Sequence, residues 1–526
     1  MDKRSGEISR REALARLGGA AVGSALATGL PAGAETTSAP MPRRAKAGSQ
    51  DRPNILWITS EGIPLEMLGC YGGTLLKTPN IDRIANEGMR FDNSFVTNGL
   101  CAPSRATLLT GKYSHENGMM SNPYTPPRPG VTQTFDTAQE TFPKILQREG
   151  YQTGIVGKWH LPVNPGEVGF DYFVFKRGAG GPYYAENGYF RNPKLGSKEI
   201  VKAEIPGYIT DNVTDLVIEG IEQMTQPFMM MVQFFNDHRP FQPPHKYEHL
   251  YDDVRIKEPG TFYDDYSHRA AAAREAHMRI ADMPDFDPPK SLTTRQRKQW
   301  NYQQFMGHFL GTFRSQDDNV GRLLDYLEKS GLAENTIVVF TADHGFFLGD
   351  HGWFDKRFMY EQAIRVPWMV RWPGKVKPGS VRKDWVINID NAPTALDMVG
   401  VAVPEDMQGR SLRPLMEGQP APADWRKSLY YHYYEFGPPH WVLPHYGIRT
   451  EHHKLIYYYS VNEWELFDLD KDPDEMESLY EWSGYRVHPG YETIAADLVT
   501  QLKHLRKEFK DTTGMPVRVW PTRQYD

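Results

Sequence analysis

The sequence predicts an α/β fold with a large mixed, mainly parallel sheet sandwiched by helices. From residue 52 onward, short β-rich runs alternate with amphipathic helical patterns, as in sheets whose strands are joined by helices. Polar residues stand where several of these runs end, and ligands bind at such strand ends in parallel sheets. From about residue 408, aromatic-rich short strands and one closing helix predict a smaller C-terminal α+β subdomain with an antiparallel sheet.

Four runs are predicted to be buried strands, namely residues 54–60 (NILWITS), 151–156, 227–235 and 336–342. Apolar residues at helical spacing predict helices over 80–89 and over 316–331, the second ending at Gly331. Residues 247–299 are rich in charge and proline, which predicts an insertion on the surface or at the rim of a cleft. In the C-terminal part, antiparallel strands are expected within 428–436, 445–459 and 463–475, followed by a helix over 491–509.

The first residues carry export features. Paired Arg10 and Arg11 precede an apolar Ala/Gly/Leu run and a small-residue cleavage site at residues 32–34, which predicts a twin-arginine signal peptide over 1–34. Residues 35–51 are predicted to be a linker, followed by a catalytic domain over 52–407 and the subdomain over 408–526. We therefore expect export by the twin-arginine translocon to the periplasm or the exterior, without stable membrane insertion after signal removal.

Composition excludes some functions. The chain of 526 residues is long enough for a large core, and its net charge of −6 with a pI near 6.3 gives no basic surface for nucleic acid. Aromatic residues make up 12% of the chain, which suits either a carbohydrate-facing surface or a large aromatic core.

Several chemically active residue types follow the predicted strands directly. Because the carboxyl ends of parallel strands share one edge of the sheet, these side chains are expected to converge there. Each is a weak signal alone, since a single histidine near a strand end is more often structural. The residues are Glu61, Lys158, His160, His238, Asp343 and His344.

The stretch CAPSRATLLTG, residues 101–111, contains one of only two cysteines. Pro103 suits a first helical turn and Gly111 a helix end, so Cys101 is expected at a helix N-terminus, where free N–H groups and the dipole favour an anion. Arg105 can fold back toward Cys101 and add positive charge. A structural thiol, a disulfide with Cys70 and a reactive group all remain open, whereas a thiolate metal site normally needs more cysteines.

This stretch resembles the signature of the type I sulfatases of the alkaline phosphatase superfamily, Cys-x-Pro-Ser-Arg-x-x-x-x-Thr-Gly, at every fixed position. Other segments resemble the same family in the right order, from residue 52 to the C-terminal helix. They include RPNILWITSEG, TPNIDRIANEGMRF, GYQTGIVGKWHL, HRPFQPP, the run from NTIVVFTADHG to VRWPG, and WELFDLDKDPDE.

The resemblance implies that a formylglycine-generating or sulfatase-maturating enzyme oxidises Cys101 to formylglycine. The hydrated aldehyde then attacks sulfur through one hydroxyl and expels sulfate through the other. The cysteine stays unpaired in that family, so Cys70 is expected to be a buried structural thiol. His160 matches the histidine that takes the diol proton, and His238 matches the general acid that protonates the leaving alcohol.

Three basic residues also match family positions. Lys158 and Lys356 correspond to the lysines that hold the sulfate oxygens, and Arg105 to the arginine that fixes the diol.

The metal site departs from the family pattern. Type I sulfatases usually hold calcium with two adjacent acidic residues after the first strand and an Asp-Asn pair after a later one. Here the pairs are Glu61-Gly62 and Asp343-His344, so one oxygen ligand is missing. With the diol of residue 101 as a further ligand, calcium is the expected ion, and manganese or zinc are alternatives because imidazole is a ligand.

The function expected from this resemblance is hydrolysis of a sulfate ester on a carbohydrate, such as a glycosaminoglycan or polysaccharide fragment with N-acetylhexosamine 6-sulfate. The smaller lobe is expected to bind the sugar through His440, His445 and Arg449. Two alternatives stay open, namely a phosphodiesterase or phosphonate monoester hydrolase of the same superfamily, and a sulfated-glycan-binding protein whose catalysis has decayed.

Overall fold

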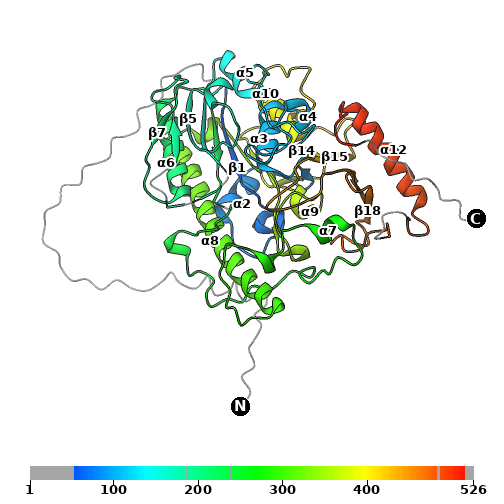
Figure 1. Ribbon diagram of the computed structural model, residues 1–526. Coiled ribbons are helices and arrows are strands. Elements are labelled where there is room, and N and C mark those ends of the chain that lie inside the picture. Colours follow the sequence, from blue (N-terminus) through cyan, green and yellow to red (C-terminus); the bar gives the residue numbers. More distant parts are fainter. Residues whose placement is uncertain are drawn as a thin grey trace, which may run out of the picture.

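Ten strands form one mixed sheet in the computed structural model (Figure 1). The central five strands pair in parallel, and antiparallel strands extend the sheet on both sides, which confirms the predicted architecture. In spatial order the strands are β13 (Ser380–Arg382), β2 (Met89–Phe91), β12 (Trp368–Arg371), β9 (Thr336–Ala342), β1 (Asn54–Ser60), β8 (Phe228–Gln233), β4 (Gln152–Lys158), β5 (Tyr172–Lys176), β6 (Tyr189–Arg191) and β7 (Val201–Ala203).

The structure describes residues 52–515 except 179, 182, 185–187, 237 and 482–485. The predicted signal peptide at 1–34 and the predicted linker at 35–51 both lie outside the described residues.

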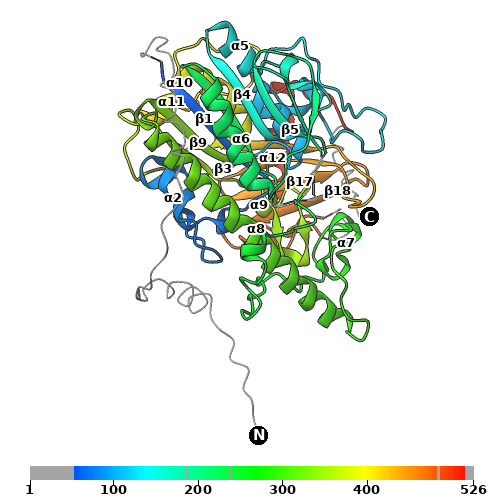
Figure 2. The same cartoon turned by 90° about the vertical axis from the view of Figure 1, so that its left-hand side faces the viewer.

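Helices cover both faces of the sheet. Strand β1 shows the division, since Leu56 and Ile58 belong to one hydrophobic core and Ile55 and Trp57 to another. One face is covered by α2 (Pro79–Asn86), α6 (Ile209–Gln223) and α8 (Thr294–Lys329), of which α6 and α8 lie in front of the sheet in Figure 2. The other is covered by α3 (Cys101–Thr110), α5 (Phe142–Arg148) and α10 (Asn391–Met398).

Helix α8 begins 22 residues before the predicted helix at 316–331, which is therefore too short. The reason is local, because Thr293 and Gln296 form a capping box that starts the helix among polar residues. The predicted end is confirmed, since Gly331 follows with a φ of 74°. Although α8 has 36 residues, it is amphipathic, and no described helix is long and apolar enough to cross a membrane.

The remaining segment, 247–293, contains only short helices, including α7 (Ala271–Glu275). It is anchored to the main domain, since Arg239 forms a bidentate ion pair with Asp285 at 2.7 and 2.8 Å. The insertion therefore lies beside the loop that carries His238.

A second, antiparallel sheet forms the C-terminal part of the fold, as predicted. Its strands are β15 (Ser428–Tyr433), β16 (His445–Thr450), β17 (His453–Tyr458) and β18 (Glu463–Asp468), and α12 (Glu492–Glu508) packs on it at the outer edge of the molecule (Figure 1). Strand β15 is joined to the main domain, because the Tyr431 hydroxyl accepts from the N–H of Gly99 at 3.0 Å and donates to the carbonyl of Arg357 at 2.6 Å. Gly99 lies two residues before Cys101, and Arg357 directly follows Lys356.

Candidate active site

The carboxyl ends of β1, β4 and β9 bring the predicted residues to one edge of the sheet. Glu61 follows β1, Lys158 is the last residue of β4, and Asp343 and His344 follow β9. Since β1 pairs in parallel with β9 and with β8, and β8 pairs in parallel with β4, the four side chains emerge together. All four are almost completely buried.

Cys101 is the first residue of α3, and Gly111 ends the helix with a φ of 65°, as the motif predicts. The Cys101 Sγ lies 3.0 Å from Oε1 of Glu61 and 3.4 Å from Nε2 of His344. Burial and Glu61 raise the pKa of this thiol, but Lys158, Lys356 and His344 outweigh them and lower it to about 6. The helix N-terminus thus presents residue 101 in an environment that stabilises negative charge.

Both cysteines are free, so the disulfide alternative is wrong. Cys70 lies in the short 3-10 helix Gly69–Tyr71, with its Sγ 3.5 Å from Sδ of Met369. It is half-buried rather than buried, because its turn lies at the surface of the domain.

Glu61, Cys101, Asp343 and His344 form a potential metal site, since one ligand atom of each lies within 4.8 Å of all the others. The set fits a divalent cation. Burial and the nearby Glu61 raise the pKa of Asp343, and a cation between the two carboxylates would remove this repulsion. Two carboxylates, an imidazole and the group at residue 101 supply mixed oxygen and nitrogen ligands.

Arg105 binds the carboxylates of this cluster. Its Nη2 lies 3.0 Å from Oε2 of Glu61 and 3.0 Å from Oδ2 of Asp343, and its Nη1 donates to the carbonyl of Lys158 at 3.0 Å and to the side chain of Gln233. The guanidinium therefore orders the two acidic side chains. The side chain of Arg105 turns back toward residue 101, as expected. Its hydrogen bonds, however, go to the carboxylates of Glu61 and Asp343 and not to Cys101.

Two lysines add positive charge at the same point. Lys158 Nζ lies 2.6 Å from Oε1 of Glu61, and Lys356 Nζ lies 3.7 Å from the same atom. Burial raises the pKa of Glu61, but these lysines and Arg105 outweigh it and hold the pKa well below the usual range. With Glu61 ionised, Lys158, Lys356 and Arg105 gather at its carboxylate, and this concentration of positive charge suits an anionic ester.

Both predicted catalytic histidines lie in this field. Burial and the charge of Lys158 hold the pKa of His160 well below its usual value, and burial and Lys356 do the same for His238. The ring of His160 has a buried Nδ1 with no partner, and its backbone has a φ of 59°, in the left-handed region. Backbone strain and an unsatisfied buried nitrogen are features of functional sites.

The loop around Lys356 supplies residues that the sequence analysis did not identify. Asp355 and Arg357 have φ angles of 80° and 98°, both are buried, and Nη1 of Arg357 lies 2.7 Å from Oδ1 of Asp355. His440 joins them, because its Nε2 lies 2.7 Å from Oδ2 of Asp355. The signal that could have identified them is proximity to Lys356 in "FDKRF", which places two further charged residues on one tight loop.

Of the three predicted sugar-binding residues, only His440 lies at the site. His445 is fully buried in β16, where its Nδ1 donates to the carbonyl of Leu443 at 2.8 Å and its ring stacks on Tyr431. Arg449 is paired with Glu361 at 3.2 Å, with its guanidinium over Trp385. The prediction that His445 and Arg449 face the substrate is wrong, because the strand turns both side chains into structural contacts.

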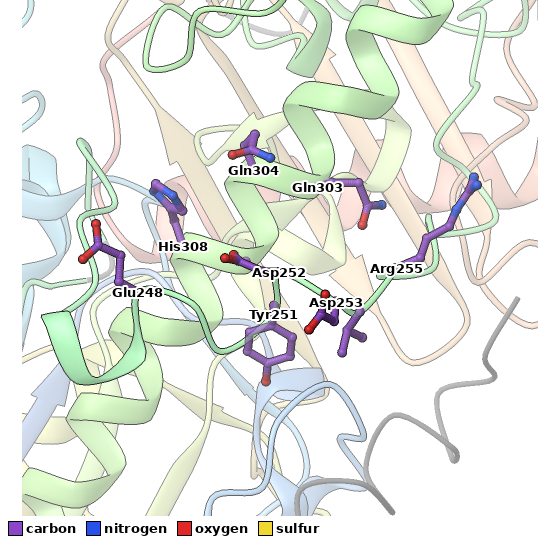
Figure 3. A pocket seen from close by; sticks show the side chains of 10 residues that line it. Glu248, Tyr251, Asp252, Asp253, Arg255, Gln303, Gln304 and His308 are labelled. Atoms are coloured by element: carbon purple, nitrogen blue, oxygen red, sulfur yellow. The ribbon is translucent and has the colours of Figure 1, made fainter. Parts of the chain in front are cut away.

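A surface pocket of about 530 Å³ lies between residues 248–255 and α8 (Figure 3). Its lining includes Glu248, Asp252 and Asp253 and no member of the metal cluster. Three acidic side chains would repel a sulfated ligand, so this pocket does not compete with the cluster as the site of an anionic substrate.

The fold and the cluster together define a hydrolase of the alkaline phosphatase superfamily. A family model described as Sulfatase matches residues 53–401, and one described as N-sulphoglucosamine sulphohydrolase, C-terminal, matches residues 349–508. The chain belongs to the type I sulfatase family and is a sulfuric ester hydrolase.

Similar proteins include an N-acetylglucosamine-6-O-sulfatase of Bacteroides thetaiotaomicron, 40% identical over 88% of this chain and 87% of the relative. A protein solved in complex with its substrate D-glucosamine-2-N,6-O-disulfate is 39% identical, with a TM-score of 0.78 over 88% of this chain and 99% of the other. The phosphonate monoester hydrolase of Agrobacterium radiobacter is 19% identical, with a TM-score of 0.66 over 87% of this chain and 96% of the other, and shows the shared fold alone.

Proposed function

We propose that this sulfatase removes the 6-O-sulfate from glucosamine units, N-acetylated or N-sulfated, in fragments of sulfated glycans such as glycosaminoglycans. The observation that carries the proposal is the 40% identity to an N-acetylglucosamine-6-O-sulfatase over 88% of the chain. The polar group Asp355, Arg357 and His440 beside Lys356 supports it, because buried charged side chains next to the sulfate-binding residues suit sugar hydroxyls.

We propose that the mature nucleophile is formylglycine at residue 101, produced by a formylglycine-generating or sulfatase-maturating enzyme. The motif, the position at the start of α3 and the absence of a disulfide support this. When present, the hydrated aldehyde supplies one hydroxyl to attack sulfur and a second to release sulfate.

The side chains around residue 101 have distinct roles in this proposal. Lys158 and Lys356 hold the sulfate oxygens and offset the negative charge that develops on them. His160 accepts the proton of residue 101, and its low pKa keeps the ring neutral and ready to do so. His238, on the half-buried loop after β8, donates a proton to the oxygen of the leaving sugar. Arg105 positions Glu61 and Asp343.

The divalent metal, proposed to be calcium, would be held by Glu61, Asp343, His344 and residue 101. When bound, the ion polarises the substrate oxygens and the group at residue 101.

The edge of the site suits a second sugar ring. Trp441 is 38% exposed, follows His440 directly, and is held edge-on against Phe436 at 5.3 Å between ring centroids. An exposed tryptophan fixed in this way offers a flat apolar surface to the face of a neighbouring sugar. The proposed substrates therefore include oligosaccharides, whose second sugar would stack on Trp441.

Export by the twin-arginine pathway to the periplasm or beyond stays part of the proposal. It is supported by the paired arginines, the apolar run and the cleavage site of residues 1–34.

The test uses protein co-produced with a maturating enzyme, in which intact mass shows that the Cys101 thiol has become an aldehyde. Turnover is measured on glucosamine derivatives sulfated at O2, O3, O6 or N, as monosaccharides and disaccharides. Release of sulfate from the 6-O-sulfated compounds alone is the expected result. Turnover of an aryl phosphonate ester in preference to an aryl sulfate would favour the phosphonate hydrolase alternative instead. Binding of the sulfated sugars without turnover by converted, metal-loaded protein would favour the decayed glycan-binding alternative.

A further inference from the structure

The proposed general acid, His238, lies in the loop that follows β8. Its Nδ1 lies 3.3 Å from the carbonyl oxygen of Arg239. Because a carbonyl oxygen only accepts, this contact keeps a proton on Nδ1 whether or not the ring is charged. Nε2 is therefore the nitrogen that gives its proton to the oxygen of the leaving sugar, after which the ring is neutral with its proton on Nδ1.

The loop between β5 and β6 covers the Nδ1 side of this ring. A Cβ atom at Gly180 would lie 3.0 Å from Nδ1 of His238 and would overlap the carbonyl oxygen of Arg239, so only glycine allows so close an approach. The N–H of Gly181 donates to the same carbonyl at 3.4 Å. This loop therefore blocks movement of the ring toward that side.

Tyr183 of the same loop binds the main chain of His238. Its hydroxyl donates to the carbonyl of His238, and the carbonyl oxygens of Arg239 and Phe235 lie 3.3 and 3.5 Å from it. The side chain is 1% exposed, and its ring packs edge-on against Tyr208 at 6.4 Å between centroids. A buried, fixed hydroxyl at these carbonyls holds the turn that carries the general acid.

The insertion holds the other side of this turn through Arg239. The guanidinium that forms the bidentate pair with Asp285 also lies over the ring of Phe354, 5.2 Å from its centroid. Phe354 precedes Lys356 by two residues, and its N–H donates to the carbonyl of Met278, in the insertion, at 2.9 Å. The side chain of Asp285 is only 7% exposed, so the pair is largely shielded from water. It ties the turn of His238 to the segment that leads to Lys356.

We infer that Tyr183 and Asp285 are positioning residues for the general acid. Tyr183 fixes the carbonyl of His238, and Asp285 fixes Arg239 against the segment before Lys356. Together they hold Nε2 of His238 beside the sugar oxygen that leaves. The inference rests on the proposed role of His238 and deepens it, because it assigns a part in proton transfer to the β5–β6 loop and to the insertion.

The experiment compares Tyr183→Phe and Asp285→Asn with wild type as converted, full-length mature enzyme, on a 6-O-sulfated sugar and on 4-nitrophenyl sulfate. Both substitutions keep the shape of the side chain. We expect each to lower kcat for the sugar sulfate about tenfold, with KM near the wild-type value, because a displaced acid transfers its proton less efficiently. For 4-nitrophenyl sulfate, whose leaving group needs no proton, kcat should change less than about twofold.

Tyr172→Phe and Asp282→Asn are the matched controls. Tyr172 is also 1% exposed and donates to the carbonyl of Leu216 at 3.0 Å, and Asp282 pairs with Arg297 at 3.2 Å on the surface of the insertion. Each control loses a contact of the same kind at a place outside the turn of His238. We therefore expect kcat of the controls to equal that of wild type on both substrates.

Each test substitution is also made in the His238→Asn background, where the acid is already absent. We expect no further loss of kcat for the sugar sulfate in that background, because both residues act through His238. A full tenfold loss there, or an equal loss on the two substrates in the single variants, would overturn the inference. Wild-type kcat of either single variant would overturn the assignment of that residue. If His238→Asn itself lowers kcat equally for both substrates, the proposed general acid is wrong, and the inference fails with it.

Discussion

Nε2 of His440 lies 2.7 Å from Oδ2 of Asp355, and this contact joins the C-terminal subdomain to the loop that carries Lys356. Burial and Arg357 lower the pKa of His440 to about 4, so the ring beside Asp355 is neutral at pH 7. Asp355 also binds Arg357. The subdomain therefore shapes the surface next to Lys356, and we expect variation there to change which sugar is bound.

The first prediction concerns Trp441, which follows this histidine. We expect Trp441→Ala to lower kcat/KM for a 6-O-sulfated disaccharide about fivefold to tenfold, because stacking of a sugar on the exposed ring is lost. The change should lie in KM, and the monosaccharide should be hydrolysed as by wild type.

Tyr263→Ala is the matched control, since Tyr263 is 41% exposed and its ring lies under Arg295 of α8. An equal loss with monosaccharide and disaccharide would show that Trp441 acts on the fold of the site and not on a second sugar.

The second prediction separates the roles of the two histidines. In His238→Asn, we expect kcat for a sugar sulfate to fall about 10²-fold to 10⁴-fold, because a sugar alkoxide leaves slowly without a proton. A 4-nitrophenyl sulfate needs no such proton, so its kcat should fall less than about tenfold. Stopped assays of both substrates with the same converted protein measure the difference.

The His160→Asn variant provides the contrast. Because residue 101 needs a proton acceptor whatever the leaving group is, we expect kcat to fall for both substrates. If His238→Asn reduces kcat equally for both substrates, the assignment of His238 as general acid is wrong.

The sequence was informative wherever a residue's role depended on its local element. Glu61, Asp343 and His344 stand directly after strands, so a parallel sheet had to bring them to one edge. Cys101 at the start of α3 followed from Pro103 and Gly111 in the same way. In these cases the backbone geometry, which local patterns encode, was sufficient to place the side chain.

The sequence was not informative where a role depended on which way a strand of the smaller sheet faces. His445 and Arg449 lie in β16, and the surrounding aromatic residues on both faces gave no alternation from which to assign an inner side. The contact of His440 with Asp355 joins residues 85 positions apart and depends on how two domains dock. Likewise, the closeness of His344 to Gly62, where a Cβ atom would lie 2.8 Å from Cε1 of the ring, exists only once β1 and β9 are paired.

The third prediction concerns pH. In the proposed mechanism His160 accepts a proton in its neutral form, which is present above its pKa, and that pKa lies well below 6.5 because of burial and Lys158. His238 must carry a proton to act, and burial and Lys356 lower its pKa as well. We therefore expect kcat/KM for sugar sulfates to be greatest on the acidic side of pH 7 and to fall about tenfold per pH unit above the pKa of His238.

The alkaline decline should disappear in His238→Asn, whose residual activity no longer depends on that proton. An optimum above pH 8 for wild type with a sugar sulfate would contradict the assignment of His238.

The fourth prediction concerns Glu61, whose carboxylate is shared by Lys158 at 2.6 Å, Arg105 at 3.0 Å and the metal cluster. In Glu61→Gln the shape of the side chain is kept but its charge is lost, so we expect calcium to bind at least about 100-fold more weakly. Lys158 and Arg105 would then lose the carboxylate that they share, and their uncompensated positive charge disfavours an added metal ion.

Metal content after dialysis and calorimetric titration with Ca²⁺ measure this effect. Glu66→Gln is the control, because Glu66 is an exposed acidic residue on the neighbouring turn Leu65–Met67. Retention of wild-type calcium affinity by Glu61→Gln would contradict this prediction. It would mean that the buried carboxylate pairs with the lysines and Arg105 and does not bind a metal ion.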